Sequence, residues 1–136
     1  MAKPTTTSDR YIESVGRRKT AIARVRITPA TAMSMTINDK DAKDYFVTKD
    51  LYATCVDPFL KVAGQPFLVT VRVSGGGIAG QAVAVRHAVS RALIDFNHGL
   101  RAELKELGFL KRDPRAKERR KAGLKKARKS PQWSKR

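Results

Sequence analysis

The sequence predicts an α+β domain, a mixed sheet packed with helices on one side, followed by a long basic C-terminal tail. Two stretches, Lys19–Thr28 and Phe67–Val73, alternate apolar and polar residues with the period of a half-buried strand. A third stretch, Ile78–Phe96, spaces its apolar residues by three and four, as an amphipathic helix does. A chain of 136 residues without a visible internal repeat fits one domain.

The first predicted strand, Lys19–Thr28, has an apolar face and a basic face. Its apolar face carries Ala21, Ala23, Val25 and Ile27. Pro29 interrupts this strand in the predicted pattern. A second alternation through Met33, Met35 and Ile37 ends at the turn-forming pair Asn38-Asp39, which indicates a hairpin.

Two short helical segments are predicted next, over residues 41–47 and 48–63, although Pro58 limits the length of the second. A turn at residues 64–66 then leads into the strand Phe67–Val73. We expect the large side chains of the helical region to supply the core: Tyr45, Phe46, Leu51, Tyr52 and Leu60.

The longest predicted helix follows the glycine run at residues 75–77. The sequence Asn97-His98-Gly99 predicts its end, and a second helix, Leu100–Leu107, ends at Gly108. Phe109 and Leu110 close the folded part. The apolar stripe of the long helix holds Ile78, Ala82, Val85, Val89, Leu93 and Phe96, whereas Arg86, Ser90 and Asn97 lie off it.

The charge distribution divides the chain into three parts. Residues 111–136 hold 13 of the 29 Lys and Arg but only two acids, Asp113 and Glu118, which gives +11 of the net +17. Such a tail cannot bury enough apolar surface to offset about 1 to 2 kcal/mol of backbone entropy per residue. We therefore expect it to order only on a polyanion, whereas residues 11–110 form the globular domain and residues 1–10 a flexible leader.

The sign of the net charge fits nucleic acid, an anionic membrane surface or an acidic protein. No apolar run approaches the roughly 20 residues that cross a bilayer, and the tail lacks the continuous apolar face of a membrane-binding helix. Runs of basic residues point in all directions and suit a polymer that surrounds them, so nucleic acid is favoured over an acidic protein. The single Cys55 fits a reducing compartment, and the cytoplasm is the expected location.

The segment Gly75–Gly80 matches the dinucleotide-binding pattern G-x-G-x-x-G. In that motif an acidic residue ends a following strand, but Asp95 lies inside the helical pattern here. A tight strand-to-helix turn is therefore the better interpretation. The N–H groups at the start of the helix, at Gly76 and Gly77, remain candidates for contact with an RNA phosphate.

No motif for catalysis or metal binding is recognisable. His87 and His98 stand eleven positions apart and far from Cys55, which is no known metal-ligand spacing, and both are interpreted as ordinary histidines. The acids between residues 39 and 50 lie in a turn-rich, solvated stretch. The sequence therefore predicts no enzyme, no metal and no cofactor.

Basic residues of the domain are the first candidates for RNA binding. Arg24 and Arg26 share one strand face without an intervening acid in the sequence, and phosphates would relieve their mutual repulsion, although a solvated surface is the alternative. Trp133 is a candidate for stacking on a base. The predicted RNA-binding set is Arg17, Arg18, Lys19, Arg24, Arg26, Arg72, Gly76, Gly77, Lys111, Arg112, Arg115, Lys117, Arg119, Arg120, Lys121, Lys125, Lys126, Arg128, Lys129 and Trp133.

Three separated segments resemble one known family, the ninth protein of the small ribosomal subunit in its bacterial form. They are VGRRKTAIARVRI, SGGGIAGQAVAVRHAVSRAL and LGFLKRDPRAKERRKAGLKKARKSPQWSKR. The last segment is similar to the bacterial and organellar branch, and the lack of a long transit peptide favours the bacterial one. Lys111 and Trp133 depart from the Thr and Phe that are common in the family.

This resemblance implies a fold like the second domain of the fifth small-subunit protein, with a left-handed βαβ crossover. It also implies a structural role in the subunit head, with ribosomal RNA and neighbouring ribosomal proteins as partners. The tail would thread toward the peptidyl site, where Ser134, Lys135 and Arg136 would contact the bound tRNA. A free-standing nucleic-acid chaperone is the alternative function.

Overall fold

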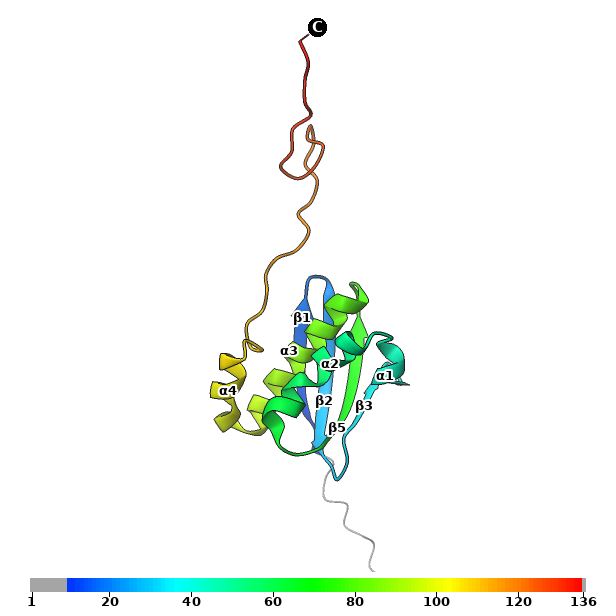
Figure 1. The fold of residues 1–136 in the computed structure, drawn as a ribbon, viewed down its shortest axis with the longest axis vertical. Helices are drawn as coiled ribbons and strands as arrows, with labels where there is room; N and C mark the ends of the chain where they lie inside the picture. Colours follow the sequence, from blue (N-terminus) through cyan, green and yellow to red (C-terminus); the bar gives the residue numbers. More distant parts are fainter. Residues whose placement is uncertain (1–9, 136) are drawn as a thin grey trace, which may run out of the picture.

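The computed structural model describes residues 10–135, and its folded part is an α+β domain (Figure 1). Five strands form one sheet of order β1-β2-β5-β3-β4 within these residues. The predicted fold class, a mixed sheet with packed helices, is confirmed. The elements are β1 (Ile12–Arg18), β2 (Ala21–Pro29), β3 (Ser34–Ile37), β4 (Lys40–Asp41), α1 (Ala42–Tyr45), α2 (Lys49–Pro58), the π-helical turn η1 (Phe59–Ala63), β5 (Phe67–Ser74), α3 (Ile78–Phe96), the 3-10 turn η2 (His98–Leu100) and α4 (Arg101–Glu106).

The sheet is mixed because one neighbouring pair of strands is parallel. β2 pairs antiparallel with both β1 and β5, and β3 pairs antiparallel with β4. β3 and β5 run parallel, and the chain between them contains α1, α2 and η1, which makes a βαβ unit. The left-handedness of this crossover stays a prediction of the family resemblance.

Helix α3 lies against β1 and β2 on one face of the sheet, and α2 lies beside α3 (Figure 1). The apolar residues of β2 and β5 that face these helices are buried. The approach of α3 to β1 depends on Gly16. A Cβ atom at this position would lie 2.1 Å from the carbonyl oxygen of Ala84 and 2.5 Å from the nitrogen of Ala88, so only glycine permits this spacing.

The predicted strand Lys19–Thr28 needs correction at both ends. Lys19 has a φ of 54° and lies in the turn between β1 and β2, so the strand begins at Ala21. Pro29 is the last residue of β2, opposite Phe67, and does not interrupt the strand. Strand β1 itself was not predicted, because its helix-facing positions include Ser14 and Gly16 and therefore show no apolar alternation.

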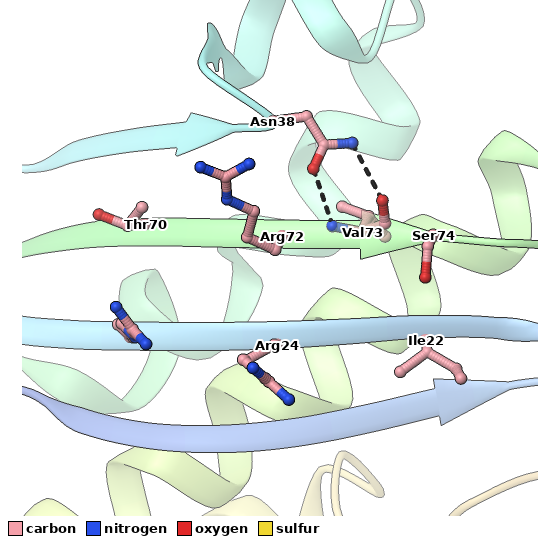
Figure 2. A pocket seen from close by; sticks show the side chains of 8 residues that line it. Ile22, Arg24, Asn38, Thr70, Arg72, Val73 and Ser74 are labelled. Carbon is pink, nitrogen blue, oxygen red and sulfur yellow. Dashed lines mark hydrogen bonds between the residues drawn. The ribbon is translucent and has the colours of Figure 1, made fainter.

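The hairpin predicted at Asn38-Asp39 is confirmed and joins β3 to β4. Both turn residues have positive φ values, 47° and 68°, as a two-residue hairpin turn requires. The Asn38 amide donates to the Val73 carbonyl at 3.0 Å and its oxygen accepts from the Val73 N–H at 2.9 Å (Figure 2). These bonds extend the pairing of β3 with β5 by one position. Met33 lies outside β3 and is 41% exposed.

The helix predicted over residues 48–63 is two elements, because α2 ends at Pro58 and the chain continues as the π-turn η1. Leu60 was predicted to be in the core, and this is wrong, since its side chain is 77% exposed. A π-turn holds more residues than an α-turn, so it directs Phe59 and Val62 inward and Leu60 outward. Phe46 is buried as predicted, and the other three expected core residues of this region are half-buried: Tyr45, Leu51 and Tyr52.

The long helix predicted from the apolar stripe is confirmed as α3, with two corrections. The first and last stripe residues, Ile78 and Phe96, are 50% and 39% exposed, although the Phe96 ring packs edge-on against Phe67 of β5 with centroids 5.2 Å apart. Ser90, predicted off the stripe, is fully buried, and its hydroxyl donates to the Arg86 carbonyl at 2.8 Å. The predicted second helix is confirmed as α4, and Gly108 follows it with a φ of 75°.

Residues 111–135 contain neither helix nor strand, and the chain beyond residue 115 extends away from the domain (Figure 1). The predicted dependence of their order on a polyanion stays a prediction, and residues 1–9 of the predicted leader lie outside the described range. None of the helices in residues 10–135 combines the length and the apolar character needed to cross a membrane.

Candidate nucleic-acid interface

The face of the sheet opposite the helices is open and carries arginines. Because side chains alternate along a strand, Arg24 and Arg26 of β2 and Arg72 of β5 project from this face. Figure 2 labels Arg24 and Arg72. The strand register places Arg24 directly opposite Arg72. The three arginines line a groove of about 590 Å³ together with Ile22, Asn38, Thr70, Val73 and Ser74.

No acid stands between Arg24 and Arg26 on β2, but acids from neighbouring segments lie beside the arginines of the open face. Glu13 of β1 lies 2.6 Å from Nε of Arg26 and 3.4 Å from Nε of Arg24. Asp39 lies 3.6 Å from Nη2 of Arg72. Glu13 was missed because β1 was not predicted, and its position opposite Arg26 follows only from the strand register.

These internal ion pairs are weak enough to exchange for phosphates. The arginine side chains are 60% exposed at Arg24, 48% at Arg26 and 71% at Arg72. Ion pairs at such exposed sites typically contribute about 0 to 1 kcal/mol. A phosphate can hold an Arg through two hydrogen bonds, so an RNA backbone competes well for the same groups. The open face is therefore suited to exchanging carboxylates for phosphates.

The glycine run forms the turn between β5 and α3. Gly75 and Gly76 have φ values of 71° and 64°, which favour glycine. A Cβ atom would lie 2.6 Å from the Thr20 carbonyl oxygen at Gly75 and 2.9 Å from Ala21 at Gly76. These glycines thus let the turn pack on the β1–β2 hairpin, which agrees with its interpretation as a tight strand-to-helix turn. Gly77 precedes α3 with open space beside its Cα, and phosphate contacts at Gly76 and Gly77 stay a prediction.

The fold separates the three consecutive cations Arg17, Arg18 and Lys19. Arg17 is exposed and lines a pocket at the edge of the sheet. The Arg18 side chain is only 16% exposed and points to the start of the tail. Lys19 occupies the hairpin turn. The run therefore does not act as one cluster, and Arg17 is the member best placed to meet a ligand.

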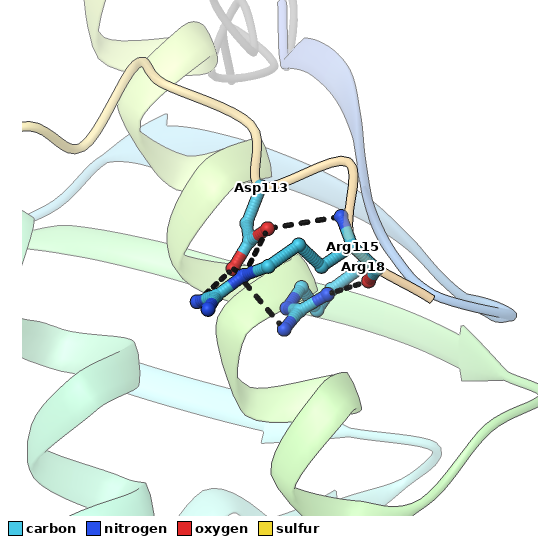
Figure 3. Close-up of polar contacts among 3 residues, drawn as sticks. All are labelled: Arg18, Asp113 and Arg115. Atoms are coloured by element: carbon cyan, nitrogen blue, oxygen red, sulfur yellow. Dashed lines mark hydrogen bonds and ion pairs between the residues drawn. The ribbon is translucent and has the colours of Figure 1, made fainter. Parts of the chain in front are cut away.

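The first residues of the tail, 111–115, here called the tail root, are bonded to the domain (Figure 3). Arg18 donates from Nη1 to the Arg115 carbonyl at 2.6 Å, and its Nη2 lies 3.3 Å from Oδ2 of Asp113. Arg115 in turn donates from Nη2 to the Asp113 carboxylate at 2.9 Å. Side-chain and backbone hydrogen bonds from Arg115 hold the pKa of Asp113 well below its usual range, and the charge of Arg18 contributes. Arg18 is therefore engaged within the protein.

Beyond the tail root, Glu118 forms ion pairs with two cations of the tail. Glu118 lies 3.2 Å from Nζ of Lys121 and 2.9 Å from Nε of Arg128, and Arg120 donates to the Leu124 carbonyl at 3.1 Å. The other predicted cations of this part are exposed and have no ion pair with residues 10–135: Lys117, Arg119, Lys125, Lys126 and Lys129.

The end of the tail presents an aromatic side chain and charge. Trp133 is 82% exposed, so its indole contacts no core. Ser134 and Lys135 follow it without regular structure, whereas Arg136 lies outside the described residues. Stacking of Trp133 and the tRNA contacts of residues 134–136 stay predictions.

Sequence reasoning missed two side chains that lie beside predicted ones. Arg91 and His87 of α3 line the same pocket as Arg17 and Arg112. The spacing of four residues between His87 and Arg91, which places both on one side of a helix, is the signal that could have found them. His87 had been interpreted as an ordinary histidine.

Among residues 10–135, no cluster of three or more His, Cys, Asp or Glu side chains could hold a metal ion.

Comparison with known families gives one finding. The family model described as "Ribosomal protein S9/S16" matches residues 16–136. The matched range begins at Gly16 within β1 and includes the rest of the domain and the basic tail.

Proposed function

The chain belongs to the ribosomal protein S9/S16 family, and from this premise we propose that it is the ninth protein of a bacterial small ribosomal subunit, bound to ribosomal RNA in the subunit head. The proposed role is structural, without catalysis. The observation that carries it is the division of charge, since 13 of 29 Lys and Arg lie in a tail that has no core of its own.

The domain binds RNA through the open face of the sheet in this proposal. Its arginines stand on rigid paired strands, so their positions are fixed before the RNA arrives. Phosphates replace Glu13 and Asp39 as partners, which costs little because the present pairs are exposed. Neighbouring ribosomal proteins of the head are further partners.

The tail binds by a different process. Each neutralised phosphate releases counterions, and this electrostatic gain supplies the free energy that orders the chain. Extended residues span about 3.3 Å each, so the 21 residues beyond the tail root reach roughly 70 Å from it. This reach and the family resemblance support the contact of Ser134, Lys135 and Arg136 with peptidyl-site tRNA.

Sedimentation of a cell lysate through a sucrose gradient tests the assignment. We expect the protein in the small-subunit and whole-ribosome fractions at low salt and also after a high-salt wash, because many phosphate contacts hold it. Recovery mainly at the top of the gradient would contradict the ribosomal role. That result would favour the alternative, a free-standing nucleic-acid chaperone.

The tRNA contact has a separate test. Small subunits reconstituted with a chain lacking Ser134–Arg136 should assemble normally and bind peptidyl-site tRNA more weakly. A matched variant, Lys135→Gln with Arg136→Gln, keeps the length of the tail and should show the same loss if charge is the cause. Unchanged tRNA affinity in both variants would remove the tRNA contact from the proposal without affecting subunit assembly.

A further inference from the structure

The outer edge of the sheet carries a second pocket, of about 260 Å³. Three parts of the chain line it: Val15 and Arg17 of β1, His87 and Arg91 of α3, and Arg112 of the tail root. β1 is the terminal strand of the sheet order, so no strand within residues 10–135 pairs with its outer edge. A water molecule occupies about 30 Å³ in the liquid, so the pocket can hold an ion of phosphate size with several waters.

This pocket gathers cations without acids. Within residues 10–135, no carboxylate forms an ion pair with Arg17, Arg91 or Arg112. The open face differs, because each of its arginines has a carboxylate nearby. Three arginines line this one pocket, and because like charges repel one another, an anion bound there would reduce their repulsion.

Two observations describe the surroundings of His87. Its Nδ1 atom is buried and has no hydrogen-bond partner among the described residues. The pKa of His87 is lowered, first by burial and then by the charges of Arg91, Arg112 and Arg86, against a backbone hydrogen bond at Leu110 that raises it. The surroundings therefore already disfavour one more positive charge.

The geometry points to a binding site for a single phosphate of an RNA backbone, with Arg17, Arg91 and Arg112 donating hydrogen bonds to its oxygens beside His87. This inference rests on the proposed RNA-binding function and adds Arg91 and His87 to it. Arg91 donates from Nη1 to the Val15 carbonyl at 2.6 Å. That bond fixes the side chain and leaves other guanidinium N–H groups for a ligand.

The site is completed by the tail root. Arg112 precedes Asp113, which Arg18 holds on the domain. A phosphate that contacts Arg112 from the pocket therefore favours the docked root, and by reciprocity the docked root favours phosphate binding. The domain and the first residues of the tail would thus share one ligand.

The first test is an NMR pH titration of the full chain with inorganic phosphate, with sodium chloride at equal ionic strength as the reference. Bound phosphate offsets the guanidinium charges, so the pKa of His87 should rise more in phosphate than in chloride. His98 lies exposed in η2 and serves as the internal control. Equal His87 pKa values in the two salts would overturn the site.

The second test measures affinity for single-stranded RNA as a function of salt. The double variant Arg17→Gln with Arg112→Gln should bind about five- to tenfold more weakly and lower the salt slope by about 0.7, the value for one lost phosphate contact. The matched control, Arg101→Gln with Lys105→Gln on exposed positions of α4, removes the same charge outside the pocket.

The outcomes separate this inference from the proposed function. If the wild-type chain binds RNA and both double variants behave alike, the pocket is not a phosphate site, and the RNA-binding function stands. If the wild-type chain itself fails to bind RNA, the proposed function fails. A loss confined to the pocket variant, with an unchanged thermal midpoint, supports the site.

Discussion

The domain and the tail differ in apolar burial and in charge. Among the described residues, every buried hydrophobic side chain lies between Ala21 and Phe109, and residues 111–135 contribute none. The tail instead carries most of the net charge, +11 of +17. One chain therefore combines a region ordered by apolar burial, which salt affects little, with a basic region whose proposed binding to RNA would depend strongly on salt.

The largest effect expected from this contrast follows removal of residues 111–136. RNA affinity at physiological salt should fall by about 1,000-fold, since 13 cations leave, and the salt slope should become much shallower. The thermal midpoint of the domain should stay almost the same, because no buried hydrophobic residue is lost. Filter binding and calorimetry measure the two quantities. A truncated domain without a cooperative transition would show that the two regions are not independent.

A core substitution should show the reverse pattern. Leu93 is fully buried, so Leu93→Ala should lower the free energy of unfolding by about 3 kcal/mol. Leu107→Ala is the matched control, because Leu107 is 44% exposed and should lose far less. Urea denaturation gives both values, and the salt slope of RNA binding should not change. Equal losses at the two positions would mean that the core lies elsewhere.

A substitution on the open face tests whether the domain, like the tail, binds RNA through its basic side chains. Arg24→Gln should weaken RNA binding about fivefold, which corresponds to about 1 kcal/mol, and leave the unfolding midpoint unchanged because its ion pair with Glu13 is exposed. Lys49→Gln, at an exposed position on the helical side, is the control. Binding unaffected by Arg24→Gln would restrict RNA recognition to the tail and the pocket at β1.

The smallest expected effect concerns pH. Because the pKa of His87 is lowered in the folded state from its ordinary value of 6.5, the unfolded chain binds more protons in that range. The free energy of unfolding should therefore rise with pH up to about 6.5. The stability that comes from the neutral form of His87 is lost as the pH falls below that value. His87→Gln should flatten this dependence, and urea denaturation from about pH 5 to 8 measures it. An unchanged pH dependence of the free energy of unfolding in the variant would mean that groups other than His87 cause it.

Sequence patterns predicted the elements whose order comes from side chains. β2, β5 and α3 bury alternating or helical stripes of apolar residues, and all three were found. Strand β1 was not predicted. Gly16 allows α3 to pack closely because it has no side chain, and a hydropathy pattern does not detect a contact of this kind. Leu60 was misplaced since the π-turn shifts the helical period by one residue, which the sequence does not reveal.

The residues of the candidate site also fall into two groups, those selected from the local sequence and those brought together only by the fold. Residue type and local spacing were enough to select Arg24, Arg26 and the basic tail. Cross-strand register decides that Glu13 faces Arg26, and packing of distant segments brings His87 to Arg112. Such neighbours depend on the whole fold, so no local pattern could have predicted them.

The bonds of the tail root determine where the part of the tail that is not held on the domain begins. With Arg115 held on the domain, the free part starts at residue 116, and its 21 residues at about 3.3 Å each describe a sphere of roughly 70 Å around one anchored point. In the proposed function, the docked domain presents the tail to the peptidyl-site tRNA as a tethered ligand, at an effective concentration that reaches the millimolar range for short linkers. The last residues can therefore have weak intrinsic affinity and still remain bound for most of the time.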